Sequence, residues 1–338
     1  MAVRLGMMSY AHVHAPMYLR HFAQMADVEM VGVYEPDPER AAEASAFGIP
    51  VFDRAEDLFE AAPDGIVVES ENTRHREDVV AASALGVPIL CEKPMAATGD
   101  DAAEMARICD ERSTALMVAF PMRFSAPLLA VREAVRDGRL GRVIAAEGVN
   151  QGQLPKHRRN WFVDPALSGG GAVMDHTVHV ADALRWILDD EVVEVYAQAN
   201  DIVARGEVEV ETSGIVSLRF GRGAIATVDC SWNRPKTYPA WGGLGIRLVG
   251  SGGTVDADAY ARKITRYDDA AGRYSTVDCS DDAYGSMLRH FVQVVRGDAA
   301  PTPAGRDGVK AAEIVDAAYR SIASGASVAL TGDETTSG

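Results

Sequence analysis

The sequence predicts two domains, an α/β domain with a doubly wound parallel sheet over residues 1–121 and an α+β domain with a large, mostly antiparallel open sheet over residues 122–338. Three observations lead to this prediction. The length of 338 residues suits two domains of ordinary size. Short apolar runs alternate with helical patterns in the first third of the chain. Longer strand-like runs separated by glycine turns follow, as in Phe220–Gly223.

The first domain is predicted from buried apolar runs and helix end signals. Pro16 opens the first helix, Gly48 and Gly86 stop two others, and Thr98 caps a fourth. The predicted strands are Val3–Met8, Val28–Tyr34, Val51–Phe52, Gly65–Val68, Val87–Cys91 and Ala115–Phe120. The predicted helical segments begin at Pro16 and span Pro38–Phe47, Leu58–Ala61 and Arg74–Leu85, with one more after Thr98. Right-handed crossovers between such strands give a Rossmann-like doubly wound sheet.

The second domain is predicted from longer apolar alternations. The predicted strands are Val143–Asn150, Val192–Asn200, Val208–Phe220, Ala224–Trp232, Ile246–Val249 and Lys263–Tyr267. The predicted helices are Ala126–Arg136, Ala172–Leu188, Tyr284–Val295 and Val309–Ile322. Because an open sheet needs cover on both faces, we expect it to pair with another copy in a homodimer or homotetramer.

Composition and charge narrow the function classes. Asp and Glu number 49 against 33 Lys and Arg, a net charge of −16, which disfavours nucleic acid and anionic membranes as partners. No apolar run approaches the roughly 20 residues of a membrane span, and the N-terminus reads as a strand rather than a signal peptide. The four cysteines include no C-x-x-C pair. We therefore expect reduced thiols and a cytoplasmic protein.

The segment after the first strand occupies the place of a dinucleotide-binding loop. It reads Ser9-Tyr10-Ala11-His12-Val13-His14 and has none of the usual glycines. His14 stands where a small residue normally permits close packing of helix and strand. We therefore expect a shifted loop, a helix that starts nearer Pro16 than Ala11, and modest affinity for the cofactor. Glu35 ends the second strand and can accept bonds from both ribose hydroxyls, which favours NAD, with NADP possible.

The same segment supports a second interpretation. Two imidazoles at His12 and His14, two residues apart after a strand, resemble the metal pair of a hydrolase barrel. The chain does not show eight strand–helix units, so this metal-dependent hydrolase is the less favoured hypothesis. The main prediction includes no metal. Asp175, His176 and His179 could together hold a mononuclear metal, but the cofactor chemistry does not require one.

The motif Glu92-Lys93-Pro94 after the fifth strand identifies a family resemblance. Further motifs are Asn72-Thr-Arg-His75, Pro121-Met-Arg123-Phe124, Leu140-Gly141-Arg-Val143 and the stretch from Ser168-Gly-Gly-Gly171 to Asp175-His176-Thr-Val-His179. Together they resemble the Gfo/Idh/MocA family of NAD(P)-dependent oxidoreductases, over most of the chain. The resemblance implies a cis Lys93–Pro94 bond. The expected cofactor-binding residues are Ser9, Tyr10, Ala11, His12, Glu35, Ser70, Asn72, His75, Glu92 and Lys93.

The spacing of the polar residues suits hydride transfer. Asp175 and His179 lie at i and i+4 and share one helix face. His179 can take or give the proton, Lys93 can stabilise a developing alkoxide, and Asp175 can orient them. We expect these three to be catalytic. Other expected substrate-binding residues are Arg123, Lys156, Arg158, Trp161 and His176.

The sequence thus favours an NAD(P)-dependent dehydrogenase or reductase that acts on a secondary hydroxyl or ketone of a sugar, polyol or related small molecule. A non-catalytic ligand-binding or regulatory protein on the same scaffold is the alternative. The missing glycines favour the alternative, and the retained Lys93, Asp175 and His179 favour the enzyme.

Overall fold

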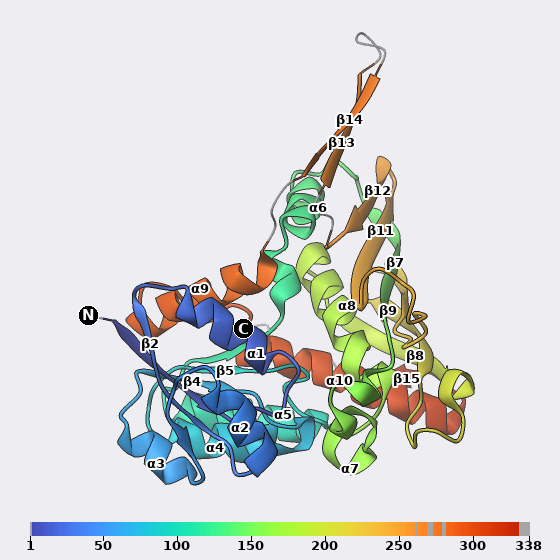
Figure 1. Cartoon of the computed structure of the whole chain (residues 1–338). Coiled ribbons are helices and arrows are strands. Elements are labelled where there is room, and N and C mark those ends of the chain that lie inside the picture. The colour runs from blue at the N-terminus through green and yellow to red at the C-terminus, as the bar shows by residue number, and fades with distance from the viewer. Residues whose placement is uncertain (1, 261–262, 269–272, 279–281, 331–338) are drawn as a thin grey trace.

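The computed structural model describes residues 2–260, 263–268, 273–278 and 282–330. It contains two large sheets, one built from each half of the chain, with helices packed around them (Figure 1). Within the described residues, no helix is both long and apolar enough to cross a membrane. The predicted fold class is confirmed.

The N-terminal sheet has six parallel strands in the order β3-β2-β1-β4-β5-β6. This order reverses direction next to β1, so the carboxyl ends of β1 and β4 form the edge where such folds bind ligands. The strands are β1 Val3–Met8, β2 Val28–Tyr34, β3 Val51–Phe52, β4 Gly65–Val68, β5 Ile89–Cys91 and β6 Leu116–Val118. The helices are α1 Ala15–Ala23, α2 Pro38–Ser45, α3 Ala55–Glu60, α4 His75–Ser83 and α5 Gly99–Glu111.

Apolar clusters cover both faces of this sheet. One cluster joins Met8, Ile66 and Val68 to α4 and α5, and the other joins Leu5, Met7 and Val67 to α1. Alternate residues of each strand therefore face opposite helical layers, as expected for a parallel sheet. The first helix begins at Ala15 with Pro16 in its first turn, which confirms the predicted late start.

The C-terminal sheet has seven strands in the order β12-β11-β7-β10-β9-β8-β15. Neighbours run antiparallel, except that β10 runs parallel to β7. The strands are β7 Val143–Gly152, β8 Val192–Asn200, β9 Ser213–Phe220, β10 Ile225–Asp229, β11 Gly242–Gly250, β12 Gly253–Asp258 and β15 Val328–Ala329. A separate ribbon pairs β13 Lys263–Asp268 with β14 Arg273–Asp278. The helices of this half are α6 Ala126–Arg136, α7 Pro165–Ser168, α8 Ala172–Leu188, α9 Ala283–Arg296 and α10 Gly305–Ser324.

The two faces of this second sheet differ. Helices α6, α8 and α10 cover one face, where Val216, Leu218 and Val228 are buried in the core. On the strands of the other face, Ile215 is 49% exposed and Ile225 is 57% exposed. This exposed apolar face is the feature that the expected self-association would use.

The last helices connect the two halves. Leu288 and Phe291 of α9 pack with Leu5 of the N-terminal core, and Figure 1 shows α9 beside α1. Helix α10 packs against both α5 and α8. Although the sequence assigns residues 122–338 to a second domain, α9 thus covers the first sheet.

Several predicted boundaries differ from the structure by one to five residues, and two of the larger differences have a visible cause. The strand predicted from Val208 starts only at Ser213. The Glu211 side chain instead bonds to the start of α8, where its carboxylate accepts the N–H groups of Gly171 and Val173. Helix α10 starts at Gly305, four residues before the predicted Val309, with the Asp307 carboxylate accepting the Ala304 N–H. Strands β12, β14 and β15 had no sequence prediction.

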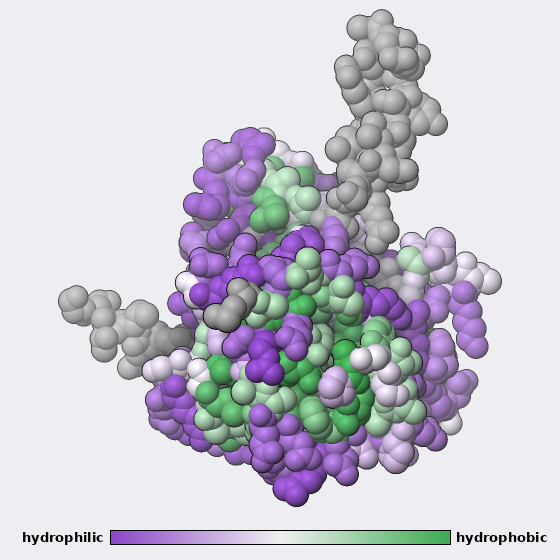
Figure 2. Space-filling model, turned by 60° about the vertical axis from the view of Figure 1, so that its left-hand side comes forward, coloured by the Kyte–Doolittle hydropathy of each residue, from purple (hydrophilic) through white to green (hydrophobic). Residues whose placement is uncertain are grey.

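Hydrophilic residues cover most of the face in Figure 2, and apolar residues gather in its lower middle. The charged residues that give the chain its net charge of −16 thus lie mainly outside the apolar clusters.

Candidate functional site

A pocket lies where the carboxyl edge of the first sheet meets α8. Its volume is about 170 Å³, enough to enclose part of a small polar ligand. Its lining residues are Val13, His14, Lys93, Asn150, Phe162, Asp175, His176, His179, Trp241, Gly242, Gly243, Tyr260 and Tyr284. The three residues expected to be catalytic are therefore brought together from both halves of the chain.

Lys93 and Asp175 form the central ion pair of this pocket. Lys93 follows β5, its peptide bond to Pro94 is cis as expected, and its Nζ lies 2.7 Å from Asp175 Oδ1. The other carboxylate oxygen, Oδ2, accepts the Trp232 indole N–H at 3.1 Å and lies 3.2 Å from His176 Nε2. Burial alone would raise the pKa of the Asp175 carboxyl, but the adjacent Lys93 charge outweighs it and holds that pKa well below its usual range.

His179 stands one turn along α8 from Asp175. Its Nδ1 is buried and has no hydrogen-bond partner among the described residues. Burial, followed by the nearby charge of Lys93, lowers the pKa of His179 well below its ordinary value. The imidazole is therefore neutral near pH 7 and can accept a proton from a ligand in the pocket.

Glycines at the start of α8 fix the placement of Asp175. A side chain at Gly170 would overlap the Tyr319 hydroxyl, and one at Gly171 would overlap the Glu211 carbonyl. The Glu211 carboxylate accepts the N–H of Gly171 at 2.9 Å and that of Val173 at 3.0 Å, which anchors the first turn. The Gly-Gly-Gly segment is thus required by close packing around the helix start.

The expected cofactor residues gather at the carboxyl edge of the first sheet. Ser9 adopts φ of 65°, a left-handed conformation that glycine usually supplies at the first fingerprint position. Asn72 Oδ1 is buried there without a hydrogen-bond partner in the described part of the chain, while Asn72 Nδ2 donates to the Ser168 carbonyl at 2.9 Å. The left-handed conformation of Ser9 and the unpartnered buried acceptor of Asn72 both fit a polar ligand such as a dinucleotide at this edge.

Glu35 lies at this edge but already accepts four hydrogen bonds. Its Oε2 accepts from Ser9 Oγ and the Tyr10 N–H at 2.9 and 2.7 Å. Its Oε1 accepts from the Asp37 N–H and from Arg40 at 2.9 and 3.0 Å. A carboxylate has about four acceptor positions, so a ribose hydroxyl at Glu35 has to replace one of these donors.

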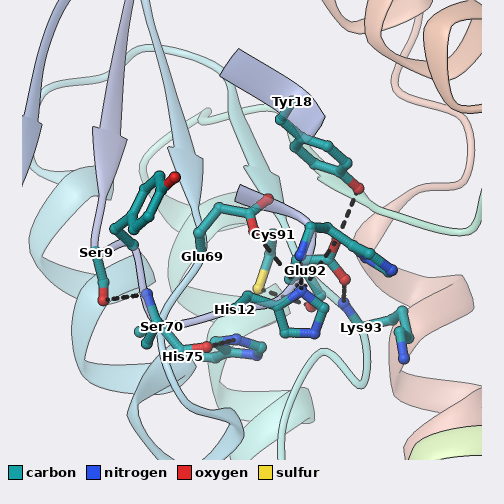
Figure 3. Close-up of polar contacts among 12 residues, drawn as sticks. Ser9, His12, Tyr18, Glu69, Ser70, His75, Cys91, Glu92 and Lys93 are labelled. Carbon is teal, nitrogen blue, oxygen red and sulfur yellow. Dashed lines mark hydrogen bonds and ion pairs between the residues drawn. The ribbon is translucent and has the colours of Figure 1, made fainter. Parts of the chain in front are cut away.

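His75 and Glu92 both make hydrogen bonds within the protein (Figure 3). The ring nitrogens of His75 lie 2.9 Å from the Pro94 carbonyl and 3.1 Å from the Ser70 carbonyl. His75 therefore positions the turn that carries Lys93. The Glu92 carboxylate accepts from the Tyr18 hydroxyl at 2.6 Å and from the Lys93 N–H at 2.8 Å.

Four of the expected substrate residues lie outside the lining of the pocket. Arg123 binds both oxygens of Asp182, at 2.9 and 2.6 Å, and its buried guanidinium helps join α8 to the start of α6. Lys156 is exposed and donates to the Glu207 carbonyl. Arg158 lies over the Trp241 ring, 5.1 Å from its centre, and so stands at the rim.

Trp161 is the fourth of these residues and covers the first loop instead. Its indole N–H donates to the Ala11 carbonyl at 2.9 Å, and its ring stacks on Phe162 at 3.9 Å between centroids. Phe162 thus lines the pocket, and Trp161 binds the loop between β1 and α1 through the Ala11 carbonyl.

Several lining residues were not expected from the sequence. Trp241, Tyr260 and Tyr284 lie near strand ends and a helix start that carry no motif. Asn150 lies late in β7, whose first residue belongs to the Gly141 motif. An isolated aromatic or amide gives no spacing signal, so only the tertiary arrangement shows their place.

Two family models match the chain. Residues 4–120 match the model of an oxidoreductase family with an NAD-binding Rossmann fold, and residues 128–256 match that of the GFO/IDH/MocA C-terminal domain. The chain is 30% identical to a 1,5-anhydro-D-fructose reductase of Ensifer adhaerens over 73% of both proteins. It is 28% identical to an inositol 2-dehydrogenase of Rhizobium meliloti over 96% of this chain and 98% of that protein.

The fold is also found among solved structures. GenD2 from gentamicin A biosynthesis, crystallised in complex with NAD, superposes with a TM-score of 0.86 at 21% identity. The alignment covers 98% of this chain and 97% of GenD2. At 21% identity this similarity shows a shared fold and nothing more.

Proposed function

The chain belongs to the Gfo/Idh/MocA family of NAD(P)-dependent oxidoreductases, and on that premise we propose that it transfers a hydride between a nicotinamide cofactor and a secondary hydroxyl or ketone of a sugar or polyol. The proposal rests on one observation. Lys93, Asp175 and His179 come from different halves of the chain and line a single pocket. The named relatives, a sugar reductase and an inositol dehydrogenase, support the substrate class.

The residues of the pocket divide the chemistry between them. The nicotinamide, when bound, accepts or supplies the hydride. Lys93 stays protonated, since Asp175 and Glu92 together outweigh the effect of burial and raise its pKa. Its ammonium can therefore stabilise negative charge on the substrate oxygen. His179 takes the hydroxyl proton during oxidation and returns it during reduction.

Asp175 holds the ammonium in place through the 2.7 Å contact with Lys93. Because Trp232 and His176 bind its second oxygen, the carboxylate cannot rotate freely. A substrate hydroxyl next to the reacting carbon can bind Asp175 only by sharing these bonds, so its first role is to position Lys93.

Spectrophotometry on a panel of sugars and polyols tests the proposal. We expect NADH formation with at least one cyclic sugar or polyol, and loss of that activity in Lys93→Ala. NADH fluorescence titration provides an independent reading of cofactor binding. Failure to bind either NADH or NADPH at millimolar concentration would contradict the proposal.

We also propose that the exposed face of the second sheet mediates self-association as a homodimer or homotetramer. Ile144, Ile215 and Ile225 each leave about half of their surface exposed there. Light scattering at micromolar concentration should give a multiple of 36.1 kDa. Ile225→Glu should shift it toward the monomer, and a monomeric wild type would contradict this proposal.

A further inference from the structure

Four side chains that the proposed reaction does not use as acid or base surround one point beneath the first loop. His12 and His14 come from the loop between β1 and α1, Glu69 follows β4, and Glu92 follows β5. Figure 3 shows His12, Glu69 and Glu92 turned toward one another. We call these four residues the His–Glu cluster.

The distances within the cluster are those of atoms that share a neighbour. Glu92 Oε1 lies 2.9 Å from His14 Nδ1 and 3.8 Å from His12 Nδ1, and His12 Nδ1 lies 3.7 Å from Glu69 Oε2. One ligand atom from each of His12, His14 and Glu92 falls within 4.8 Å of the other two. A tetrahedral zinc ion with bonds of about 2.0–2.1 Å separates its ligand atoms by about 3.3 Å. The observed separations lie on both sides of that value.

The internal hydrogen bonds of the cluster leave its centre unsatisfied. Glu92 has three partners, because its oxygens bond with His14, the Tyr18 hydroxyl and the Lys93 N–H, which leaves one of its acceptor positions unused. Both carboxylate oxygens of Glu69 and the Nε2 of His12, by contrast, are buried and have no hydrogen-bond partner in the described residues. His12 and Glu69 are each 0% exposed. A carboxyl group and an imidazole nitrogen that lack hydrogen-bond partners are costly to bury unless a ligand binds them.

The charge and the donor atoms of the His–Glu cluster indicate which kind of ligand it would bind. Two imidazole nitrogens with carboxylate oxygens form a donor set typical of zinc and neighbouring divalent transition metals. A divalent cation would balance the two buried carboxylates. A water molecule could donate to Glu69 but would add no positive charge beside the two acids.

We propose that the His–Glu cluster binds one divalent transition metal ion of the zinc class through His12, His14 and Glu92, with Glu69 completing the site. The ion links the loop that lacks the usual glycines to the ends of β4 and β5. This role replaces the close packing that a small residue at position 14 would otherwise provide. It is separate from hydride transfer, because Lys93 and His179 carry that chemistry.

Metal binding by the full-length protein tests the proposal directly. Protein stripped with EDTA and dialysed against Zn²⁺ or Co²⁺ should retain one equivalent per chain by elemental analysis. Co²⁺ should also give the visible absorption of a tetrahedral site. His12→Gln and Glu92→Gln should each weaken binding at least about tenfold. The matched control His157→Ala removes an exposed imidazole and should keep the full equivalent.

Two results would overturn the proposal. One is uptake by the wild type of less than a tenth of an equivalent at micromolar free metal. The other is wild-type stoichiometry and affinity in a folded His12→Gln variant. If that variant does not fold, the thermal unfolding of the wild type decides the question. Micromolar Zn²⁺ should raise its melting temperature and EDTA should reverse the rise, whereas no change would refute the site.

Discussion

The Lys93–Asp175 pair and the His12–Glu69 pair are both buried at the same sheet edge, but their hydrogen bonding differs. Both oxygens of Asp175 have partners, from Lys93 on one side and from Trp232 and His176 on the other. Neither oxygen of Glu69 has one in the described residues. The carboxylate of the first pair therefore has its hydrogen-bond partners without a ligand, whereas the carboxyl group of the second pair lacks them.

This difference fits the role that we propose for each region. A completed ion pair holds the ammonium at a fixed place, which is what preorganised catalysis requires. Glu69, whose carboxyl oxygens have no hydrogen-bond partner in the described residues, contributes little without a ligand. Changes at the two places should therefore have very different consequences, and the following experiments compare them.

The largest effect is expected on turnover. Lys93→Ala removes the positive partner of the substrate oxygen, and His179→Ala removes the acceptor of its proton. Each should reduce kcat by about 10²–10⁴ with nearly unchanged NADH binding. Lys310→Ala, which changes an ammonium on α10 paired with Glu313, serves as the control and should keep normal turnover. Wild-type turnover in both active-site variants would rule out this mechanism.

The next effect is on stability. Lys93→Met leaves the Asp175 charge buried without its ammonium and should lower the free energy of unfolding by about 3–5 kcal/mol. Glu69→Gln removes no hydrogen bond and, measured in EDTA, should change it by less than about 1 kcal/mol. Urea denaturation of both variants gives the two values. Equal losses of unfolding free energy in the two variants would contradict the difference in hydrogen bonding between the two pairs.

The pH dependence of stability separates the pairs further. The pKa of Asp175 is lower in the folded protein than its ordinary 3.8, so its contribution is present above that pH and is lost as the pH falls through the folded value. Below pH 3.8, the free energy of unfolding of the wild type should therefore fall more steeply with decreasing pH than that of Asp175→Asn. Denaturant midpoints measured across the acid range test this. Parallel profiles for the two proteins would show that Asp175 does not titrate as described.

The smallest effect concerns the choice of cofactor. Glu35→Ala should weaken NAD binding about tenfold and reduce discrimination against NADP, because one or two hydrogen bonds to the ribose are lost. Since Glu35 also holds Ser9 and Tyr10, Ser9→Ala is the comparison, and it should change affinity without changing the preference. Tighter binding of NADPH than of NADH by the wild type would contradict the role of Glu35.

The sequence by itself determined the architecture and the identity of the central residues. Strand runs such as Val3–Met8 and Val28–Tyr34 matched the structure residue for residue, because apolar periodicity is local. The i, i+4 spacing places Asp175 and His179 on one helix face, and Glu92-Lys93-Pro94 is a contiguous motif that is identified by its family resemblance.

Only the tertiary structure decided which side chains meet. Asn150, Trp241 and Tyr284 line the pocket from separate elements. Arg123 lies outside the pocket lining and binds Asp182. Likewise, Glu69 carries no motif, yet the ends of β4 and β5 bring it beside His12. The partners of a buried charge are set by long-range packing rather than by neighbours in the chain, so no local pattern in the sequence could identify them.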